Sequence, residues 1–179
     1  MKKSIVWGIG LTLLVLGLSG CMTMQAIKEE DKVFSQIYDA PGFTRDVLYE
    51  KTKIWIAETF RSAKAVMEYD NAKSGTLIGN GAIPFPCKDT SFYCTLRRNW
   101  TVPFTMKMEA QDNKFRLTFS NLRLAWPETY GGLIYTGHQP AGDMPLVQQE
   151  YYNMVRPALL GLGEEIKMSL KKTVDSGKW

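Results

Sequence analysis

The stretch 101-TVPFTMKMEAQDNKFRLTFS-120 carries the clearest structural pattern in the chain. Apolar and polar side chains alternate strictly over residues 104–110 and again over residues 115–119. Such alternation indicates strands with one buried face and one wet face, as in an antiparallel sheet that is covered on one side. The polar residues 111–114 stand between the two runs and predict a turn. We therefore predict a β-hairpin here.

Upstream of this hairpin, the sequence predicts three further strands and one helix. Residues 33–38 read as a strand that Pro41 and Gly42 end. Thr44 is a suitable N-cap for a helix over residues 45–60, where apolar side chains recur at every third or fourth position. Residues 63–85 read as two strands that are joined by the polar turn 70–75.

Three features interrupt these regular patterns. Gly79 and Gly81 lie inside a predicted strand and indicate a bulge or a close approach of another group to the backbone. The hydrophobic alternation changes phase near Ser120 and Asn121, which a bulge would explain. Residues 127–145 are rich in Gly and Pro and predict a long loop.

The last element is a predicted amphipathic helix from Val147 to Leu170, where apolar residues step by three or four. Pro157 lies inside it, so we expect either a kink or a division into two helices. The resulting order is strand, helix, about four antiparallel strands and helix. We therefore predict an α+β domain of two layers, with an antiparallel sheet of about four to five strands covered on one face by two helices.

The run 48-LYEKTKIWIAETFRSAKAVMEYDNAKSGTLIGNG-81 is similar to a bacterial family of domains of unknown function. The resemblance lies in a helix that leads into a SAK-containing strand and in the spaced glycines of the next strand. It covers roughly residues 33–120. That family is described as having a TATA-box-binding-protein-like (TBP-like) fold and occurs often in predicted lipoproteins. The resemblance implies a TBP-like fold, and it supplies no catalytic residues to carry over, because the family has no assigned activity.

The N-terminal segment resembles the signal of a bacterial lipoprotein. A basic start at residues 2–3 precedes an apolar run over residues 5–18, which is shorter than the roughly 20 residues that a membrane-spanning helix needs. The run ends in 18-LSGC-21, which resembles a lipobox. The resemblance implies that residues 1–20 are cleaved as a signal peptide and that Cys21 carries a diacylglycerol thioether and an acylated amino group. An ordinary signal peptide or an uncleaved anchor is the alternative.

The residue after Cys21 is Met22 rather than Asp, which by resemblance to enteric lipoproteins favours the outer membrane, with the domain facing the periplasm. We expect residues 21–32 to form a lipidated tether and residues 33–175 to form one domain. Without the signal the formal charge is near +2, too small for strong nucleic-acid binding. A lipid-anchored exported protein does not meet the chromosome, so a TBP-like shape does not imply DNA binding.

Two cysteines, Cys87 and Cys94, remain once Cys21 is lipidated. In an oxidising compartment an even pair indicates a disulfide, and closing so short a loop is worth on the order of 2–3 kcal/mol. Free thiols are one alternative. A metal site is another, but it needs four ligands and the chain has one histidine.

The sequence offers little for catalysis. His138 is the only histidine, and no Gly-x-Ser-x-Gly or His-Glu-x-x-His motif is present, so we expect His138 to be a solvated loop residue. The carboxylates that could carry acid–base chemistry are Glu128 in the predicted loop, and Glu68 and Asp70 on one face of a predicted strand. The glycines of 75-GTLIGNG-81 lack the following helix that a dinucleotide-binding loop requires. We therefore expect no catalytic, cofactor-binding or metal-binding residue.

The region 126-WPETYGGLIYTGHQP-140 is dense in aromatic residues, which are favoured at interfaces. We take Trp126, Tyr130, Tyr135 and His138 as candidate contacts for a partner or ligand; packing of Trp126 into the core is the alternative. The sequence thus favours a lipid-anchored envelope protein with a non-catalytic domain that binds an envelope protein or ligand. A lipid or glycan carrier with an apolar groove is the first alternative, and a carboxylate-based envelope hydrolase is the second.

Overall fold

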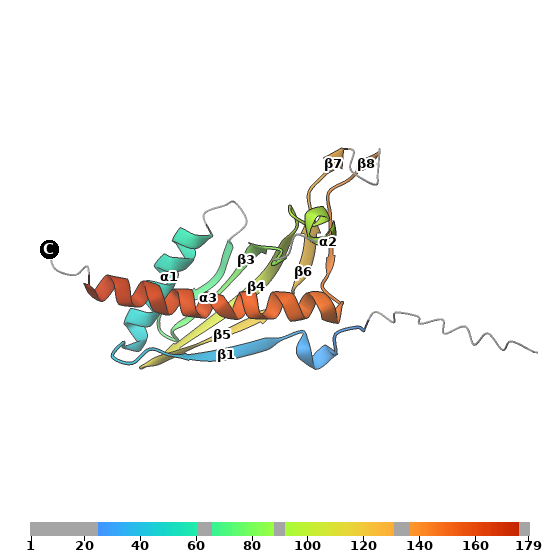
Figure 1. Cartoon of the computed structure of the whole chain (residues 1–179). Coiled ribbons are helices and arrows are strands. Elements are labelled where there is room, and N and C mark those ends of the chain that lie inside the picture. The colour runs from blue at the N-terminus through green and yellow to red at the C-terminus, as the bar shows by residue number, and fades with distance from the viewer. Residues whose placement is uncertain (1–24, 61–65, 88–91, 131–136, 176–179) are drawn as a thin grey trace, which may run out of the picture.

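A computed structural model of the chain describes residues 25–60, 66–87, 92–130 and 137–175 (Figure 1). Its strands are β1 (Phe34–Asp39), β2 (Val66–Asn71), β3 (Thr76–Pro84), β4 (Thr101–Gln111), β5 (Lys114–Ser120), β6 (Arg123–Trp126), β7 (Thr129–Tyr130), β8 (His138–Gln139) and β9 (Gly142–Pro145). Its helices are the 3-10 turn η1 (Glu29–Asp31), α1 (Arg45–Thr59), the short α2 (Phe92–Leu96) and the long α3 (Gln149–Asp175).

The predicted central hairpin is confirmed as β4 and β5. The two strands pair from Thr105 with Ser120 to Gln111 with Lys114. Asn113 in the connecting turn has a φ of 65°, a left-handed conformation that Asn tolerates better than most residues. The predicted alternation is observed, because every second side chain of β4 and β5 is buried on the inner face of the sheet. Its buried side chains are Val102, Phe104, Met106, Met108, Ala110, Phe115, Leu117 and Phe119.

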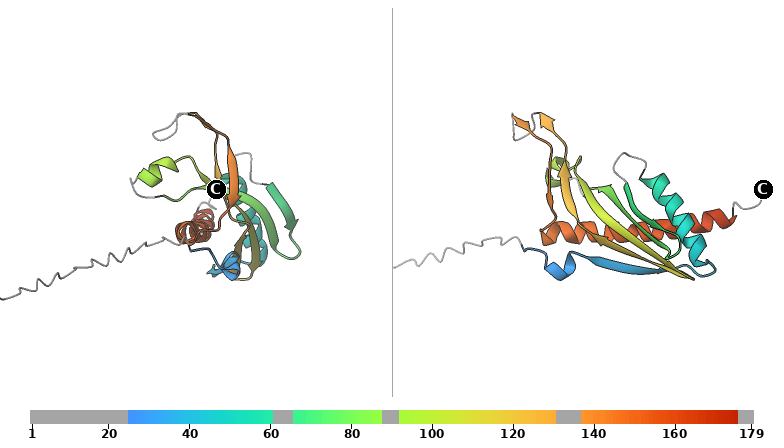
Figure 2. Two further views of the ribbon diagram at one scale, coloured as in Figure 1. Left: turned by 90° about the vertical axis from the view of Figure 1, so that its right-hand side faces the viewer. Right: turned by 180° about the vertical axis from the view of Figure 1, so that it is seen from behind.

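The sheet has seven strands, in which the main path runs β1-β5-β4-β3-β2 and β6 pairs with both β4 and β9. Helices α1 and α3 lie on its concave face (Figure 2). The predicted α+β fold with an antiparallel sheet is therefore confirmed. The predicted four to five strands are too few, because β6 and β9 join the sheet as well, and α2 and η1 add to the two predicted helices.

The predicted long loop is in large part a β-ribbon. β6 pairs with β9 from Arg123 with Pro145 to Trp126 with Gly142, and β7 pairs with β8 nearer the tip. Gly142 is needed in this ribbon because the Trp126 ring lies 2.7 Å from the place where a Cβ would stand. The sequence predicts Gly142 as a loop residue, but in the structure its missing side chain leaves room for the Trp126 ring. The ribbon projects away from the body of the sheet (Figure 1).

The change of hydrophobic phase after β5 arises from a break and not from a bulge inside one strand. Asn121 has a φ of 52°, and the chain then continues as β6. Both β5 and β6 pair with β4, through Thr105 with Ser120 and through Thr101 with Ala125. The left-handed conformation of Asn121 therefore changes which residues face inward, while the chain continues to pair with β4.

The predicted N-cap of α1 is confirmed, whereas a division of α3 at Pro157, one of the two predicted effects, is not observed. Thr44 caps α1 as predicted, since its Oγ1 accepts a hydrogen bond from the backbone N–H of Val47 at 3.4 Å. α3 is one continuous helix of 27 residues with Pro157 inside it, so the alternative of two helices is wrong. Pro157 lies in the third turn, and the apolar face that follows it holds the helix on the sheet.

From Gln25 onward the N-terminal segment packs on the domain, within the stretch 21–32 that the sequence predicts as a tether. Ala26 forms a β-bridge with Gln148, and the backbone N–H of Ile27 donates to Val147. The Ile27 side chain is 7% exposed, so burying it favours this attachment. Within the described part of the chain, no helix has the length and apolar character needed to span a bilayer.

Candidate ligand cavity

The inner face of β3 lacks two successive side chains. Leu77, Gly79 and Gly81 alternate onto this face, where they pair with inward-facing residues of β4. At Gly81 the Phe104 ring lies 2.9 Å from the place of a Cβ, so the predicted close approach is observed there. β3 pairs with β4 without a register shift, whereas the β2–β3 pairing shifts between Met67 and Tyr69. The irregularity is therefore in β2 and not at the glycines.

A cavity of about 450 Å³ lies between α1 and this glycine-containing part of the sheet. Its helical wall is one face of α1, because its residues are spaced by three, four and seven positions. These residues are Lys53, Ile56, Ala57 and Phe60. Its volume falls in the range of about 300–1,000 Å³ that is typical of small-molecule sites.

The sheet side of the cavity is mostly apolar. Gly79 lies between Met67 of β2 and Met106 of β4 in the strand register, and all three line the cavity. Methionine side chains are flexible and polarisable, so they can adapt to ligands of different shape. The rings of Phe60 and Phe104 meet edge to face at a centroid distance of 6.0 Å and bound the cavity near Gly81.

One end of the cavity carries the charged pair Lys53 and Asp70. The Lys53 Nζ lies 2.5 Å from one carboxylate oxygen of Asp70, and the Tyr49 hydroxyl donates a hydrogen bond to the other. Lys53 also lies over the Tyr49 ring, 5.8 Å from its centroid. The pair is about one-third to two-fifths exposed, so it lies at the mouth and not in the interior.

The prediction that Glu68 and Asp70 share one strand face is wrong. Because β2 shifts register between Met67 and Tyr69, the two carboxylates have different surroundings. Asp70 contacts α1, whereas Glu68 accepts a hydrogen bond from Asn80 at 2.5 Å. They do not form a carboxylate pair for acid–base chemistry.

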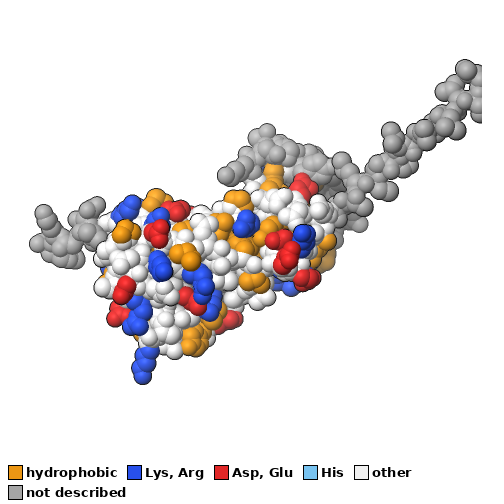
Figure 3. All heavy atoms as spheres, turned by 90° about the horizontal axis from the view of Figure 1, so that it is seen from below, with side chains coloured by type: hydrophobic (Ala, Val, Ile, Leu, Met, Phe, Trp, Pro, Cys, Tyr) orange, Lys and Arg blue, Asp and Glu red, His pale blue; other side chains and the backbone are white. Residues whose placement is uncertain are grey.

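The face of the sheet opposite α1 and α3 carries paired polar side chains. Lys107 and Arg116 form ion pairs with Glu109 at 2.9 Å and 2.7 Å. Burial alone would raise the pKa of Glu109, but the hydrogen bonds and charges of these two cations outweigh it and hold the pKa below its usual range. In the view from below, Figure 3 shows positive and negative side chains interspersed. This pattern is typical of a solvated surface.

The predicted contact residues that the structure describes lie along the β-ribbon. Trp126 is half-buried against Trp100, with ring centroids 5.5 Å apart, and its indole N–H donates to the carbonyl of Pro140. Tyr130 and His138 are register partners of β7 and β8 at the tip of the ribbon. Tyr135 lies outside the described residues. The ribbon projects from the end of the sheet away from α1 and the cavity (Figure 1).

His138 lies in β8 rather than in a loop, and its Nε2 atom contacts Glu128. Both side chains are about half exposed. The contact joins the two arms of the ribbon and therefore has a direct structural use.

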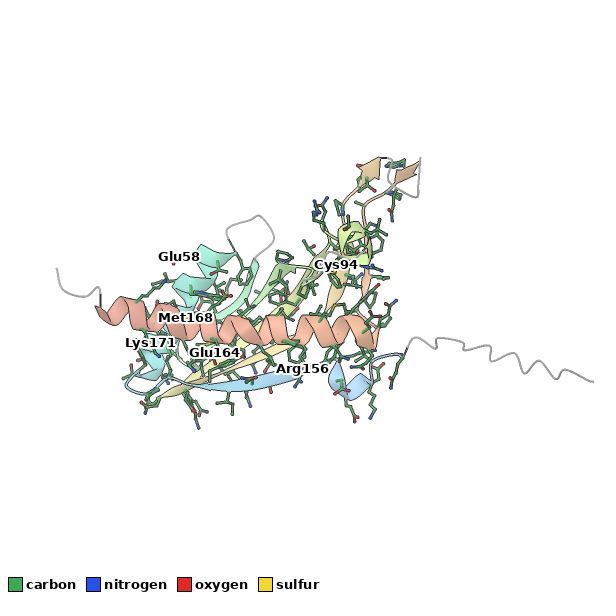
Figure 4. The ribbon with its side chains drawn as sticks, viewed as in Figure 1. Glu58, Cys94, Arg156, Glu164, Met168 and Lys171 are labelled. Carbon is green, nitrogen blue, oxygen red and sulfur yellow. A yellow bond between two sulfur atoms is a disulfide. The ribbon has the colours of Figure 1, made fainter. Side chains whose placement is uncertain are left out.

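Cys87 and Cys94 form a disulfide, with Cα atoms 5.4 Å apart. Cys94 lies in α2, as Figure 4 shows. Arg97, just after α2, lies over the rings of Trp100 and Tyr151 at 5.2 Å from each centroid and donates to the Tyr151 hydroxyl at 2.6 Å. The disulfide thus borders a cation–π cluster. Among the residues that the structure describes, no three His, Cys, Asp or Glu side chains converge as metal ligands would.

A wider depression of about 720 Å³ lies between residues 39–43 and the last turns of α3. Its lining carries three charged residues, Asp39, Lys167 and Lys171, and one aromatic residue, Phe43. The cavity under α1 is smaller, but it combines an apolar lining with one charged end, which is the usual form of a ligand site. Cys21 lies outside the described residues.

A family model described as "Domain of unknown function (DUF4468) with TBP-like fold" matches residues 34–125, just over half of the chain. Among solved structures, the chain is similar to a TBP-like protein from Parabacteroides distasonis ATCC 8503, with a TM-score of 0.56 at 10% identity over 82% of this chain and 97% of that one. A DUF4468 family protein from Bacteroides ovatus ATCC 8483 gives a TM-score of 0.50 at 12% identity over 82% and 88%. Among curated proteins, no sequence matches the chain.

Proposed function

The chain belongs to the DUF4468 family of domains of unknown function with a TBP-like fold, and from this premise we propose that it is a lipid-anchored envelope protein that binds a small ligand without reacting with it. The cavity under α1 is the observation that carries the proposal. An apolar chamber with one charged end favours binding and orientation of a ligand. The sequence predicts a non-catalytic binding domain, with a lipid or glycan carrier as the first alternative. The proposal combines the two, since a carrier is a binding domain for a small ligand.

The anchor part of the proposal rests on the lipobox-like sequence before Cys21. Two or more acyl chains hold a protein stably on a bilayer, whereas one chain does so only marginally. We propose that the lipidated protein resides on the outer membrane and faces the periplasm. Labelled palmitate should enter the wild type and not the Cys21→Ser variant, and membrane fractionation should recover the wild type with the outer membrane. Absence of label, or a mature mass that still includes residues 1–20, would refute the anchor.

Native mass spectrometry of the protein extracted from its own envelope tests the binding part. We expect a non-covalent ligand mass on the wild type. The Gly79→Leu variant fills the cavity from the sheet side and should lose this mass. Gly161→Leu is the matched control, because Gly161 lies on α3 with nothing within 4 Å of an added Cβ. Loss of the ligand from both variants, or from neither, would argue against the cavity as the binding site.

The projecting β-ribbon supports a second candidate function, contact with an envelope protein (Figure 1). Its tip carries Tyr130 and His138, two of the predicted contact residues. Replacement of residues 128–140 by a short turn should then remove a partner from a pulldown of solubilised envelope, while Gly79→Leu should keep it. The opposite pattern would assign the interaction to the cavity.

A further inference from the structure

The charged end of the cavity determines which head group a ligand can carry. Asp70 has both carboxylate oxygens engaged, one by the Lys53 ammonium and the other by the Tyr49 hydroxyl. An ammonium has three N–H donors, and Asp70 uses one of them. The Lys53 ammonium at the cavity mouth therefore has N–H donors for a ligand beyond the one that contacts Asp70. It favours a ligand that ends in an acceptor, above all an anionic one.

The rest of the cavity determines the body of the ligand. From Lys53 to Phe60 the lining follows two turns of α1, about 10 Å along the helix axis at 1.5 Å per residue. Ile56 and Phe60 on the helix face Met67 and Met106 on the sheet, so the chamber beyond Lys53 is apolar. A flexible hydrocarbon chain matches such a lining, because two methionines can follow its shape.

We infer that the cavity binds an anionic amphiphile, with one acyl chain between α1 and Gly79 and its head group on the Lys53 ammonium. This inference rests on the proposed function, whose ligand class it specifies. A free fatty acid and an anionic phospholipid share this chemistry. The ligand leaves the Lys53–Asp70 ion pair intact, because it uses donors of the ammonium that Asp70 does not.

Photo-crosslinking in isolated envelope membranes tests the inference on the full lipidated chain. The probes are hexadecanoic acid, hexadecanol and a phosphatidylglycerol, each with a diazirine in its acyl chain. Labelled peptides are mapped by mass spectrometry, which separates them from the lipid on Cys21. We expect the acid to label peptides of α1 and β2 about tenfold more strongly than the alcohol, the usual scale of one charge-assisted hydrogen bond.

Three variants and two controls make the outcome specific. Lys53→Met keeps the apolar stem and should remove the preference for the acid, while Lys51→Met on the same helix should retain it. Gly79→Leu should lose the labelling by both probes, and Gly161→Leu should retain it. Ala57→Leu, which narrows the cavity from the helix side, provides a second filling variant if Gly79→Leu does not fold.

Equal labelling by acid and alcohol would overturn the anionic head group, and labelling that neither filling variant reduces would overturn the cavity as the site. Labelling by the phosphatidylglycerol in place of the free acid would support the inference and identify a membrane lipid as the source. If none of the probes labels α1 or β2, the inference is wrong. The proposed function would then still stand wherever native mass spectrometry finds another ligand that Gly79→Leu removes.

Discussion

Tyr38 links the sheet to α3. Its ring stacks on Phe115, with centroids 5.1 Å apart, and its hydroxyl donates to the backbone carbonyl of Leu160 at 2.6 Å. Burial, and after it the negative charge of Glu164, raises the pKa of Tyr38 to about 12 from 10.0. The folded protein therefore favours the neutral phenol, which makes its stability sensitive to alkaline pH.

Tyr38→Phe tests this pH dependence. At pH 9 the variant should unfold about 1 kcal/mol more easily, because it loses the hydrogen bond to Leu160. Above pH 10 the unfolded wild type releases the phenolic proton, which the folded form keeps until about pH 12. The free energy of unfolding of the wild type then falls with pH. The gap between the two proteins should narrow from pH 10 toward pH 12 in urea titrations, and a constant gap would contradict the assignment.

Two glycines of α3 give opposite predictions for the same substitution. At Gly163 an added Cβ would lie 2.1 Å from the Tyr38 ring, whereas at Gly161 nothing lies within 4 Å. Gly163→Ala should lower the free energy of unfolding by about 1–3 kcal/mol through overpacking. Gly161→Ala should raise it by about 0.5–1 kcal/mol, because alanine favours a helix. Thermal melts of both variants measure these changes in stability. Equal effects would show that the Tyr38 ring does not pack against Gly163 of α3.

At the scale of elements, the disulfide is expected to stabilise the end of the sheet next to α2. The double variant Cys87→Ser with Cys94→Ser should lower the free energy of unfolding by about 2–3 kcal/mol, since a short closed loop is released. Arg97 and Trp100 follow this loop directly, so the near-ultraviolet circular dichroism of the tryptophans should weaken with it. Reduction of the wild type should give the same change. An unchanged melting temperature would show that the cation–π cluster alone holds α2.

Elements with a periodic burial pattern could be predicted from the sequence, and elements that depend on distant partners could not. The β4–β5 hairpin and the Thr44 cap of α1 are local patterns, and both are confirmed. β9 contains Gly142 and Pro145 and reads as loop, yet it becomes a strand because β6 offers it an edge. Gln25 to Ile27 likewise fold onto residues 147–149, more than a hundred positions away.

The candidate site was only partly visible in the sequence. Gly79 and Gly81 were recognisable as unusual strand residues, and their meaning, a chamber under α1, required the pairing of β3 with β4. Lys53 carried no local signal at all, since lysine on a helix is ordinarily a solvated residue. Its position at spacing three, four and seven from Ile56, Ala57 and Phe60 is the pattern that could have indicated a shared face.

At the scale of the whole molecule, the proposed anchor and the cavity lie toward different ends of α3. Gln25 hydrogen-bonds to Gln149 at the N-terminal end of this helix, whereas α1 packs nearer its C-terminal end (Figure 1). A helix of 27 residues is about 40 Å long. If Cys21 is lipidated, the anchor is four residues before Gln25. A fully extended chain of that length spans at most about 14 Å. The anchored end would then lie near the bilayer, and the cavity would lie farther from it.

Fluorescence quenching by a spin-labelled lipid head group tests this orientation. Val33 is 54% exposed beside the N-terminal attachment, and Glu58 is exposed on α1, where Figure 4 labels it. In lipidated protein on vesicles, a fluorophore on Val33→Cys should be quenched much more strongly than one on Glu58→Cys, because such quenching requires close contact. Unlipidated Cys21→Ser protein is the control and should show little quenching at either position. Stronger quenching at Glu58→Cys would mean that the end of the molecule with the cavity lies at the membrane, so a ligand would enter directly from the lipid rather than from the aqueous side.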